Sequence, residues 1–146
     1  MSPWKDISAS EILPQREPFV FVDALVSYDE RETVTSFTVP ERHLLVEDGV
    51  LTASGLLENM AQSSAARIGY LCRFILHVPV RIGYIGAVRR FRVYRLPAVG
   101  ETLLTTIQLR EDVFGISLTD AVVRVGDEII ADASLKTALG EKEVAQ

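Results

Sequence analysis

The residue best suited to chemistry in this chain is Glu58, a carboxylate on the helix-like segment SGLLENMAQSSAARIGY at residues 54–70. At about 100° per residue, Glu58 and Gln62 lie one turn apart along the edge of this helix. The neighbours of Glu58 carry no charge, which predicts dry surroundings and suits a carboxyl group that donates a proton near neutral pH. A glutamate in the first turns of a helix can also serve only to balance the helix dipole. The predicted apolar face consists of Leu57, Met60, Ala61, Ser64, Ala65 and Ile68.

The overall composition indicates one domain that contains this helix. The chain has 146 residues, is 48% hydrophobic and has a mean hydropathy of +0.21, which is ample for one core. No apolar run approaches the ~20 residues of a membrane span, and the N-terminus lacks the apolar stretch of a signal peptide. The single cysteine, Cys72, continues the apolar side of the helix and is expected in the core. We therefore expect a cytoplasmic protein that is not bound to a membrane.

Charge is distributed unevenly along the chain. The net charge is −5, yet residues 59–100 contain seven arginines and no Asp or Glu. Such a rim can attract a small acidic or phosphorylated partner, or its arginines can pair with acids elsewhere in the fold. A pI near 5 and the lack of a known nucleic-acid-binding motif argue against binding of nucleic acid. Two histidines without clustered Cys or Asp do not predict a metal site. The candidate docking arginines are Arg89, Arg90, Arg92 and Arg95.

The pattern of apolar residues predicts the order ββαββββ. A short helix at 6–13 precedes a hairpin formed by strands 19–28 and 33–39, and a loop at 40–48 leads to the helix at 52–71. The later strands are expected at 80–94, 102–111, 114–125 and 128–139, with a turn at 112–113 and a loose polar tail at 140–146. This order fits an α+β fold in which an antiparallel sheet curls around one long helix. The exposed edge of so short a sheet predicts a dimer.

Several segments resemble the hot-dog fold 3-hydroxyacyl-ACP dehydratases of fatty-acid and related acyl-chain synthesis, the FabZ- and FabA-like proteins. LPQREPFVFVD at 13–23 is similar to the family segment LPHRxPFLLVD, and GLLENMAQSSAA at 55–66 is similar to its GVLxxExMAQxxG helix. The stretches at 82–103 and 129–139 resemble its basic strand and its closing strand. The compact loop before the helix is closest to a divergent branch, the dehydratase-like proteins of aryl-polyene and related pigment pathways. The resemblance covers nearly the whole chain.

This resemblance implies a division of labour between an acid and a base. Glu58 matches the acid that protonates the departing hydroxyl, and His43 falls in the loop where the family carries its base. In the family the two residues come from different subunits of a dimer, and a backbone amide at the start of the helix polarises the thioester carbonyl. That amide would be the one of Ser54 or Gly55, with Gln15 and Gln62 available to bind substrate. The substrate would be carried on the phosphopantetheine of acyl carrier protein or of CoA, with no other cofactor, and the arginine rim would dock the acidic carrier.

The sequence departs from the family pattern at two places that bear on activity. Gln15 replaces the histidine of LPHR, and RHLLVEDGVL at 42–51 replaces the GHFPxxPxxPG segment. His43 can therefore be a base or merely a packed or exposed histidine. Three functions remain open: a hydro-lyase that uses His43 and Glu58, a thioesterase in which Glu58 orients water with help from Gln62 or Gln15, and a non-catalytic partner of an active hot-dog subunit.

Overall fold

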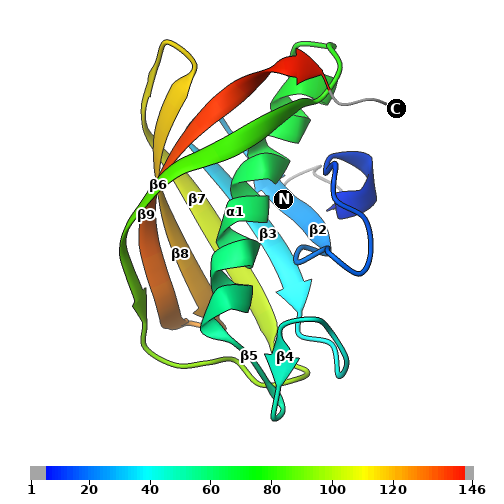
Figure 1. The fold of residues 1–146 in the computed structure, drawn as a ribbon, viewed down its shortest axis with the longest axis vertical. Helices are drawn as coiled ribbons and strands as arrows, with labels where there is room; N and C mark the ends of the chain where they lie inside the picture. Colours follow the sequence, from blue (N-terminus) through cyan, green and yellow to red (C-terminus); the bar gives the residue numbers. More distant parts are fainter. Residues whose placement is uncertain (1–5, 144–146) are drawn as a thin grey trace.

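The computed structural model describes residues 6–143 as one curved sheet that wraps a long helix (Figure 1). The helix lies across the concave face of the sheet. The elements are β1 (Ile7–Ser8), the 3₁₀ turn η1 (Ala9–Glu11), β2 (Ala24–Tyr28), β3 (Glu32–Thr38), β4 (Val46–Glu47), β5 (Val50–Leu51), α1 (Ala53–Tyr70), the π-helical turn η2 (Leu71–Ile75), β6 (Arg81–Val93), β7 (Thr102–Val113), β8 (Ile116–Val125) and β9 (Glu128–Glu143).

The main sheet is antiparallel, with the strand order β1-β2-β3-β7-β8-β9-β6. The strand that follows α1 in the chain, β6, pairs only with β9 and forms one edge of this sheet. The short hairpin of β4 and β5 lies apart from the sheet and leads directly into α1. One helix on one face of such a sheet is the hot-dog arrangement that the sequence predicts.

Local chemistry explains where α1 begins and how closely it packs. Thr52 is its N-cap, and the Thr52 side chain accepts a hydrogen bond from the N–H of Gly55 at 3.3 Å. Gly69 allows the helix to touch the N-terminal segment, because a Cβ at this position would lie 2.0 Å from the carbonyl oxygen of Ile12. The absence of a side chain at Gly69 therefore fixes how near the helix lies to η1.

The interior is apolar at one end of the helix and polar toward the other. The largest cluster packs Leu56 and Met60 of α1 against β3, β7, β8 and β9, with Leu51, Leu103 and Ile107 among its fully buried members. The buried face of the helix also carries Asn59, between Leu56 and Met60, and further along Ser63, Ser64 and Arg67, opposite threonines and a serine of the sheet. The buried stripe is thus rotated from the predicted one, since Leu57, Ala61 and Ala65 are only half-buried.

Most predicted elements are present, with changes at their ends. The predicted strand at 19–28 is a strand only from Ala24, because side chains of α1 bind the backbone of the preceding segment. The predicted helix at 6–13 is reduced to the 3₁₀ turn η1. The turn predicted at 112–113 lies at Phe114 and Gly115, which both have positive φ, and β9 continues to Glu143 through much of the predicted loose tail. Cys72 is buried, as predicted. No helix within residues 6–143 has the length and apolar character needed to cross a membrane.

Candidate active site

Glu58 lies in the second turn of α1, on the side of the helix that faces the N-terminal segment. Its side chain is exposed in the single chain, so the dry surroundings that the sequence predicts are not provided by this chain alone. One of its oxygens, Oε2, accepts a hydrogen bond of 3.2 Å from Nε2 of Gln62. The carboxyl group is therefore oriented by its neighbour one turn along, and Oε1 remains available to a ligand.

Gln62 is buried and binds the backbone of the N-terminal segment as well as Glu58. Its Oε1 accepts a hydrogen bond of 2.7 Å from the N–H of Phe21, and its Nε2 donates one of 2.8 Å to the carbonyl oxygen of Phe19. Both ends of the amide are used in this way. Within the chain, Gln62 therefore links Glu58 to residues 19–21, while its binding of substrate stays a prediction.

A second amide, Asn59, fixes the same segment from the adjacent position on the helix. Its Nδ2 donates a hydrogen bond of 2.7 Å to the carbonyl oxygen of Phe21, and its Oδ1 accepts one from the hydroxyl of Thr105 on β7. Asn59 is not among the site residues predicted from the sequence. The available signal is a fully polar side chain at a helix position that faces the sheet, which requires buried hydrogen-bond partners.

His43 binds the same segment from the other direction. Its Nε2 lies 2.8 Å from the carbonyl oxygen of Val20, and its ring packs edge-on against Phe21, with 4.4 Å between ring centroids. A carbonyl oxygen only accepts, so Nε2 carries a proton and Nδ1 of the neutral ring holds the lone pair. Nδ1 is buried and has no hydrogen-bond partner among the described residues. His43 is thus packed and oriented, with its basic nitrogen unused.

The segment 19–21 connects the two candidate groups. The carbonyls of Phe19 and Phe21 accept hydrogen bonds from α1, whereas the carbonyl between them, that of Val20, accepts one from His43. Glu58, through Gln62, and His43 are therefore attached to the same short backbone segment through different carbonyl groups.

The start of α1 contains the predicted amide donors. The N–H of Gly55 is used by the N-cap Thr52, whereas Ser54 lies at the exposed end of the helix, where the positive end of its dipole is found. Ser54 is thus the better placed of the two amides predicted to polarise a carbonyl. Gln15 is half-buried, and its Oε1 is a buried acceptor with no hydrogen-bond partner among the described residues.

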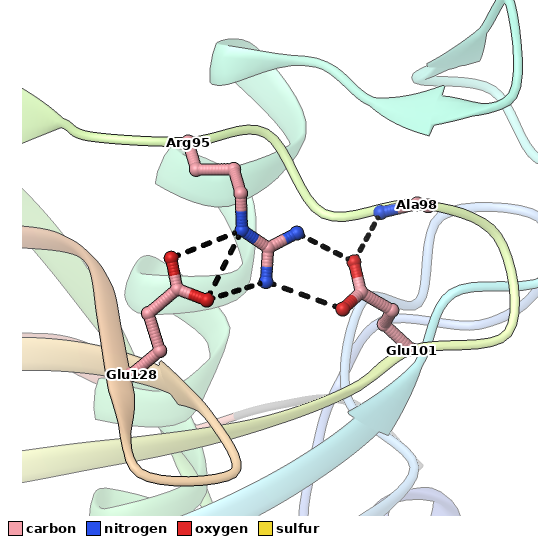
Figure 2. A network of polar contacts seen from close by, with 4 residues as sticks. All are labelled: Arg95, Ala98, Glu101 and Glu128. Atoms are coloured by element: carbon pink, nitrogen blue, oxygen red, sulfur yellow. Dashed lines mark hydrogen bonds and ion pairs between the residues drawn. The ribbon is translucent and has the colours of Figure 1, made fainter.

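The four predicted docking arginines divide into two pairs. Figure 2 shows Arg95 held between Glu101 and Glu128, with Nη1 2.7 Å from Glu101 and Nη2 3.0 Å from Glu128. Arg92 pairs with Asp132 at 2.9 Å, and the same carboxylate accepts a hydrogen bond from Tyr94. These two arginines therefore follow the alternative that the sequence leaves open, in which arginine pairs with acids of the fold.

The same ion pairs alter the titration of their members. The Arg95 guanidinium, assisted by the N–H of Ala98, holds the pKa of the Glu101 carboxyl below its ordinary value. Conversely, hydrogen bonds to Glu101 and Glu128 raise the pKa of Arg95. The hydrogen bond to Asp132 likewise raises the pKa of Arg92. Arg92 and Arg95 are thus held by carboxylates of the same chain.

Arg89 and Arg90 are exposed and lie beside a groove of about 710 Å³. The groove is bounded by the β7–β8 hairpin and by residues of β6, β8 and β9. Its lining combines cations with apolar groups, among them Arg110, Lys136, Phe114 and Leu118. Arg89 and Arg90 are therefore the predicted docking residues that remain available to an acidic partner. Within residues 6–143, no three His, Cys, Asp or Glu side chains are grouped as a metal site requires.

The curved sheet around one helix, together with a glutamate held on that helix and an oriented histidine in the loop before it, defines a hot-dog protein of the acyl-thioester dehydratase type. A family model described as "ApeP-like: ApeP dehydratase" matches residues 7–146. The chain belongs to this ApeP-like dehydratase family. The match confirms the resemblance to a divergent branch of the hot-dog dehydratases and identifies a dehydratase-like protein.

Curated relatives and solved structures agree with this assignment. The 3-hydroxyacyl-[acyl-carrier-protein] dehydratase FabZ of Desulforamulus reducens is 30% identical over 94% of this chain and 99% of the relative. FabZ of Vibrio atlanticus is 29% identical, with 90% of each chain covered. Among solved structures, the dehydratase heterocomplex ApeI:P from Xenorhabdus doucetiae has a TM-score of 0.85 at 17% identity over 94% of each chain, which shows the common fold.

Proposed function

We propose that this chain is a subunit of a cytoplasmic dehydratase that removes water from 3-hydroxyacyl groups carried by acyl carrier protein. The reaction needs a base for the C2 proton and an acid for the C3 hydroxyl. The observation that carries the proposal is the attachment of both Glu58 and His43 to residues 19–21, through Gln62 and through the carbonyl of Val20. The phosphopantetheine arm that carries the substrate is the only cofactor we assign.

The chemistry we propose uses the atoms that hold no hydrogen bond to a described residue, and it requires that the substrate reach Nδ1 of His43, which is buried in the single chain. The unprotonated Nδ1 of His43 takes the C2 proton, the C2–H electrons form the C2=C3 double bond, and the C3–O bond breaks. The departing oxygen takes a proton from the Glu58 carboxyl group, and water leaves. The exposed N–H of Ser54 at the start of α1 is placed to stabilise negative charge on the thioester oxygen. A proton transfer from the imidazolium to the carboxylate restores the starting state.

The separate attachment of the two groups and the exposure of Glu58 support a site shared between two subunits. Glu58 is attached to residues 19–21 through Gln62 and His43 through the carbonyl of Val20, and no hydrogen bond among the described residues joins Glu58 to His43. We propose that the acid of one subunit works with the base of its partner. A covering partner would also supply the dry surroundings that Glu58 lacks in the single chain.

The edge strand β6 is the surface we assign to this partner. Edge strands present unpaired backbone groups, and β6 is 13 residues long. The exposed apolar residues Tyr84, Ile85, Val88 and Val93 lie along it, and Phe74, Leu76 and Val78 follow α1 nearby in the chain. A homodimer paired along β6 would cover these groups.

A second candidate function, that of a partner subunit without its own base, is favoured by two observations. Nδ1 of His43 is buried in the single chain, and Gln15 offers an amide where related sequences offer a histidine. The ApeI:P structure, which shares this fold, is that of a dehydratase heterocomplex. In this case the chain would supply Glu58 and the acyl site to a different hot-dog subunit that supplies the histidine.

Mass spectrometry of 3-hydroxyacyl-ACP incubated with the protein distinguishes these functions. Glu58→Gln keeps a partner for Gln62, and His43→Gln keeps an N–H donor for Val20, so both variants retain the contacts of the fold while losing the titrating group. The matched control is His77→Gln at an exposed histidine. Loss of water that both site variants abolish and His77→Gln retains supports the dehydratase. Free acid that depends on Glu58 alone indicates a thioesterase, and unchanged substrate in every sample indicates the partner role.

Mixing the two inactive variants tests the shared site. If subunits exchange, half of the dimers contain one of each variant, and each such dimer has one complete site of two, so about a quarter of the wild-type activity returns. A site contained in one chain would give no recovery in the mixture.

A further inference from the structure

A buried cation in the polar half of the interior has no acidic side chain in contact with it. Arg67 lies on α1 with 7% of its surface exposed, and it forms no ion pair with any carboxylate whose side chain the structure describes. Among the described residues, its guanidinium makes one hydrogen bond, from Nη2 to the hydroxyl of Ser117 at 3.1 Å. A guanidinium has five N–H donors, so most of its capacity is unused in a setting where an isolated charge is costly.

The sheet places hydroxyl groups around this guanidinium. Ser117 lies directly opposite Thr137 in the pairing of β8 with β9, and Thr119 follows on the same face of β8. Toward the other side, the charge of Arg67 acts on the phenol of Tyr28, which is paired with Thr33 in the β2–β3 ladder. Ser64 is three residues before Arg67 and therefore on the same face of the helix. Ser64, Thr119 and Thr137 thus lie on the helix face and on the strands that meet at the contact of Arg67 with Ser117.

The hydroxyl oxygens around Arg67 are also without partners. Thr33, Ser64, Thr119 and Thr137 each have a buried side-chain oxygen with no hydrogen bond to a described residue. Buried hydroxyls are normally satisfied, and three of these four, those of Ser64, Thr119 and Thr137, share a helix face or a strand register with the contact of Arg67 and Ser117. Water could satisfy the hydroxyls, but only an anion would also balance the charge of Arg67.

We propose that Arg67 and the hydroxyls of Ser64, Thr119 and Thr137 bind a small anion of the carboxylate class between α1 and the sheet. A carboxylate accepts at about four positions, which matches the remaining guanidinium donors and the hydroxyls. The nearest acidic group in the hydrogen-bond chain is Asp112, which is reached only through Ser117 at 3.4 Å. Asp112 is exposed, so it is a weak counter-charge for a guanidinium inside the fold. This site is separate from Glu58 and His43 and does not depend on the function proposed above.

The test is the thermal unfolding of the intact protein in sodium acetate, with acetamide as the neutral analogue and sodium chloride to hold the ionic strength constant. Acetate is expected to raise the Tm of the wild type in a saturable manner, and acetamide is not. Arg67→Met should lose the response to acetate, and the exposed control Arg31→Met should keep it. Thr137→Val, which keeps the shape of the side chain, should raise the half-saturating acetate concentration by about tenfold.

Three outcomes would overturn the proposal. The first is a wild type whose Tm responds equally to acetate and chloride. The second is an equal acetate response in Arg67→Met, or in Thr137→Val should the arginine variant fail to fold. The third is an Asp112→Asn variant that loses stability while acetate has no effect on either protein, because Asp112 would then be the counter-charge. A shift of the Arg67 Nε–H resonance on addition of acetate, absent with acetamide, would be direct support.

Discussion

The side-chain amide of Gln62 is hydrogen-bonded through both its oxygen and its nitrogen, and this allows a quantitative prediction about stability. Gln62→Met keeps the volume of the side chain and removes three hydrogen bonds, to Phe21, Phe19 and Glu58. Glu58 is exposed and can bind water instead, so its lost bond costs little. The N–H of buried Phe21 and the carbonyl of Phe19 lose buried partners, and at about 1–2 kcal/mol each the free energy of unfolding should fall by about 3 kcal/mol. For a chain of this size, that corresponds to a decrease in Tm of about 6–12 °C.

Urea unfolding measures the free energy of unfolding, and amide hydrogen exchange at Phe21 shows whether the loss comes from the broken hydrogen bond. The exchange of this amide should accelerate in Gln62→Met more than that of amides in β8 and β9, because only the first loses its acceptor. The control Gln108→Met, at an exposed glutamine of β7, should stay within about 0.5 kcal/mol of the wild type. If Gln62→Met unfolds with the free energy of Gln108→Met, the amide does not hold the segment and Gln62 is not the residue that positions Glu58 against it.

Three further changes test other parts of the structure. Gly69→Ala places a Cβ against the carbonyl of Ile12 and should lower the free energy of unfolding by about 1–3 kcal/mol. Gly86→Ala is the control, because the nearest atom is 3.7 Å away and the free energy of unfolding should change little. Calorimetry of both variants measures the difference. Arg95 lowers the folded-state pKa of Glu101 from 4.5. The ion pair therefore adds its full contribution to the free energy of unfolding above the unfolded pKa, and this contribution is lost as the pH falls through the folded pKa. The wild type should therefore be more stable than Glu101→Gln at neutral pH and should lose this advantage below about pH 4, as followed by urea midpoints against pH. Val88→Arg puts a charge on the edge strand β6 and should convert the proposed dimer along β6 to a monomer in sedimentation measurements. A dimer mass that this variant leaves unchanged would exclude β6 as the interface.

The sequence predicted the elements whose residue pattern fits only one kind of secondary structure. The small residues and spacing of 54–70 predicted the long helix, and the alternation of apolar residues predicted the strands from β6 to β9. Turn positions were less certain, since the hairpin at Phe114 and Gly115 depends on two residues with positive φ rather than on the charged pair before them. The position of Glu58 on the helix edge was predictable because helical geometry determines it.

The contacts of the site were not predictable, because they depend on which backbone groups meet across the fold. Nothing in the sequence indicates that Gln62 and Asn59 bind Phe19 and Phe21, some 40 residues earlier. The division of the arginines also depends on distant partners, since Arg95 meets Glu128 only after β9 folds back beside β6. Periodicity assigns a side chain to a face of its element but cannot choose its partner.

The irregular pairing of β6 has a consequence for which chains can assemble. Its register with β9 shifts at three places along the strand, between Arg81 and Gly83, Ile85 and Ala87, and Arg89 and Arg92. At the second and third shifts the extra residue is in β6, whereas at the first the extra residues are in β9. The two irregularities of β6 interrupt the regular row of N–H and C=O groups on its outer edge, so in the pairing we propose an ordinary straight strand could not form a continuous ladder with it. A partner along this edge would need complementary irregularities at matching positions, which would favour some chains of the same fold over others.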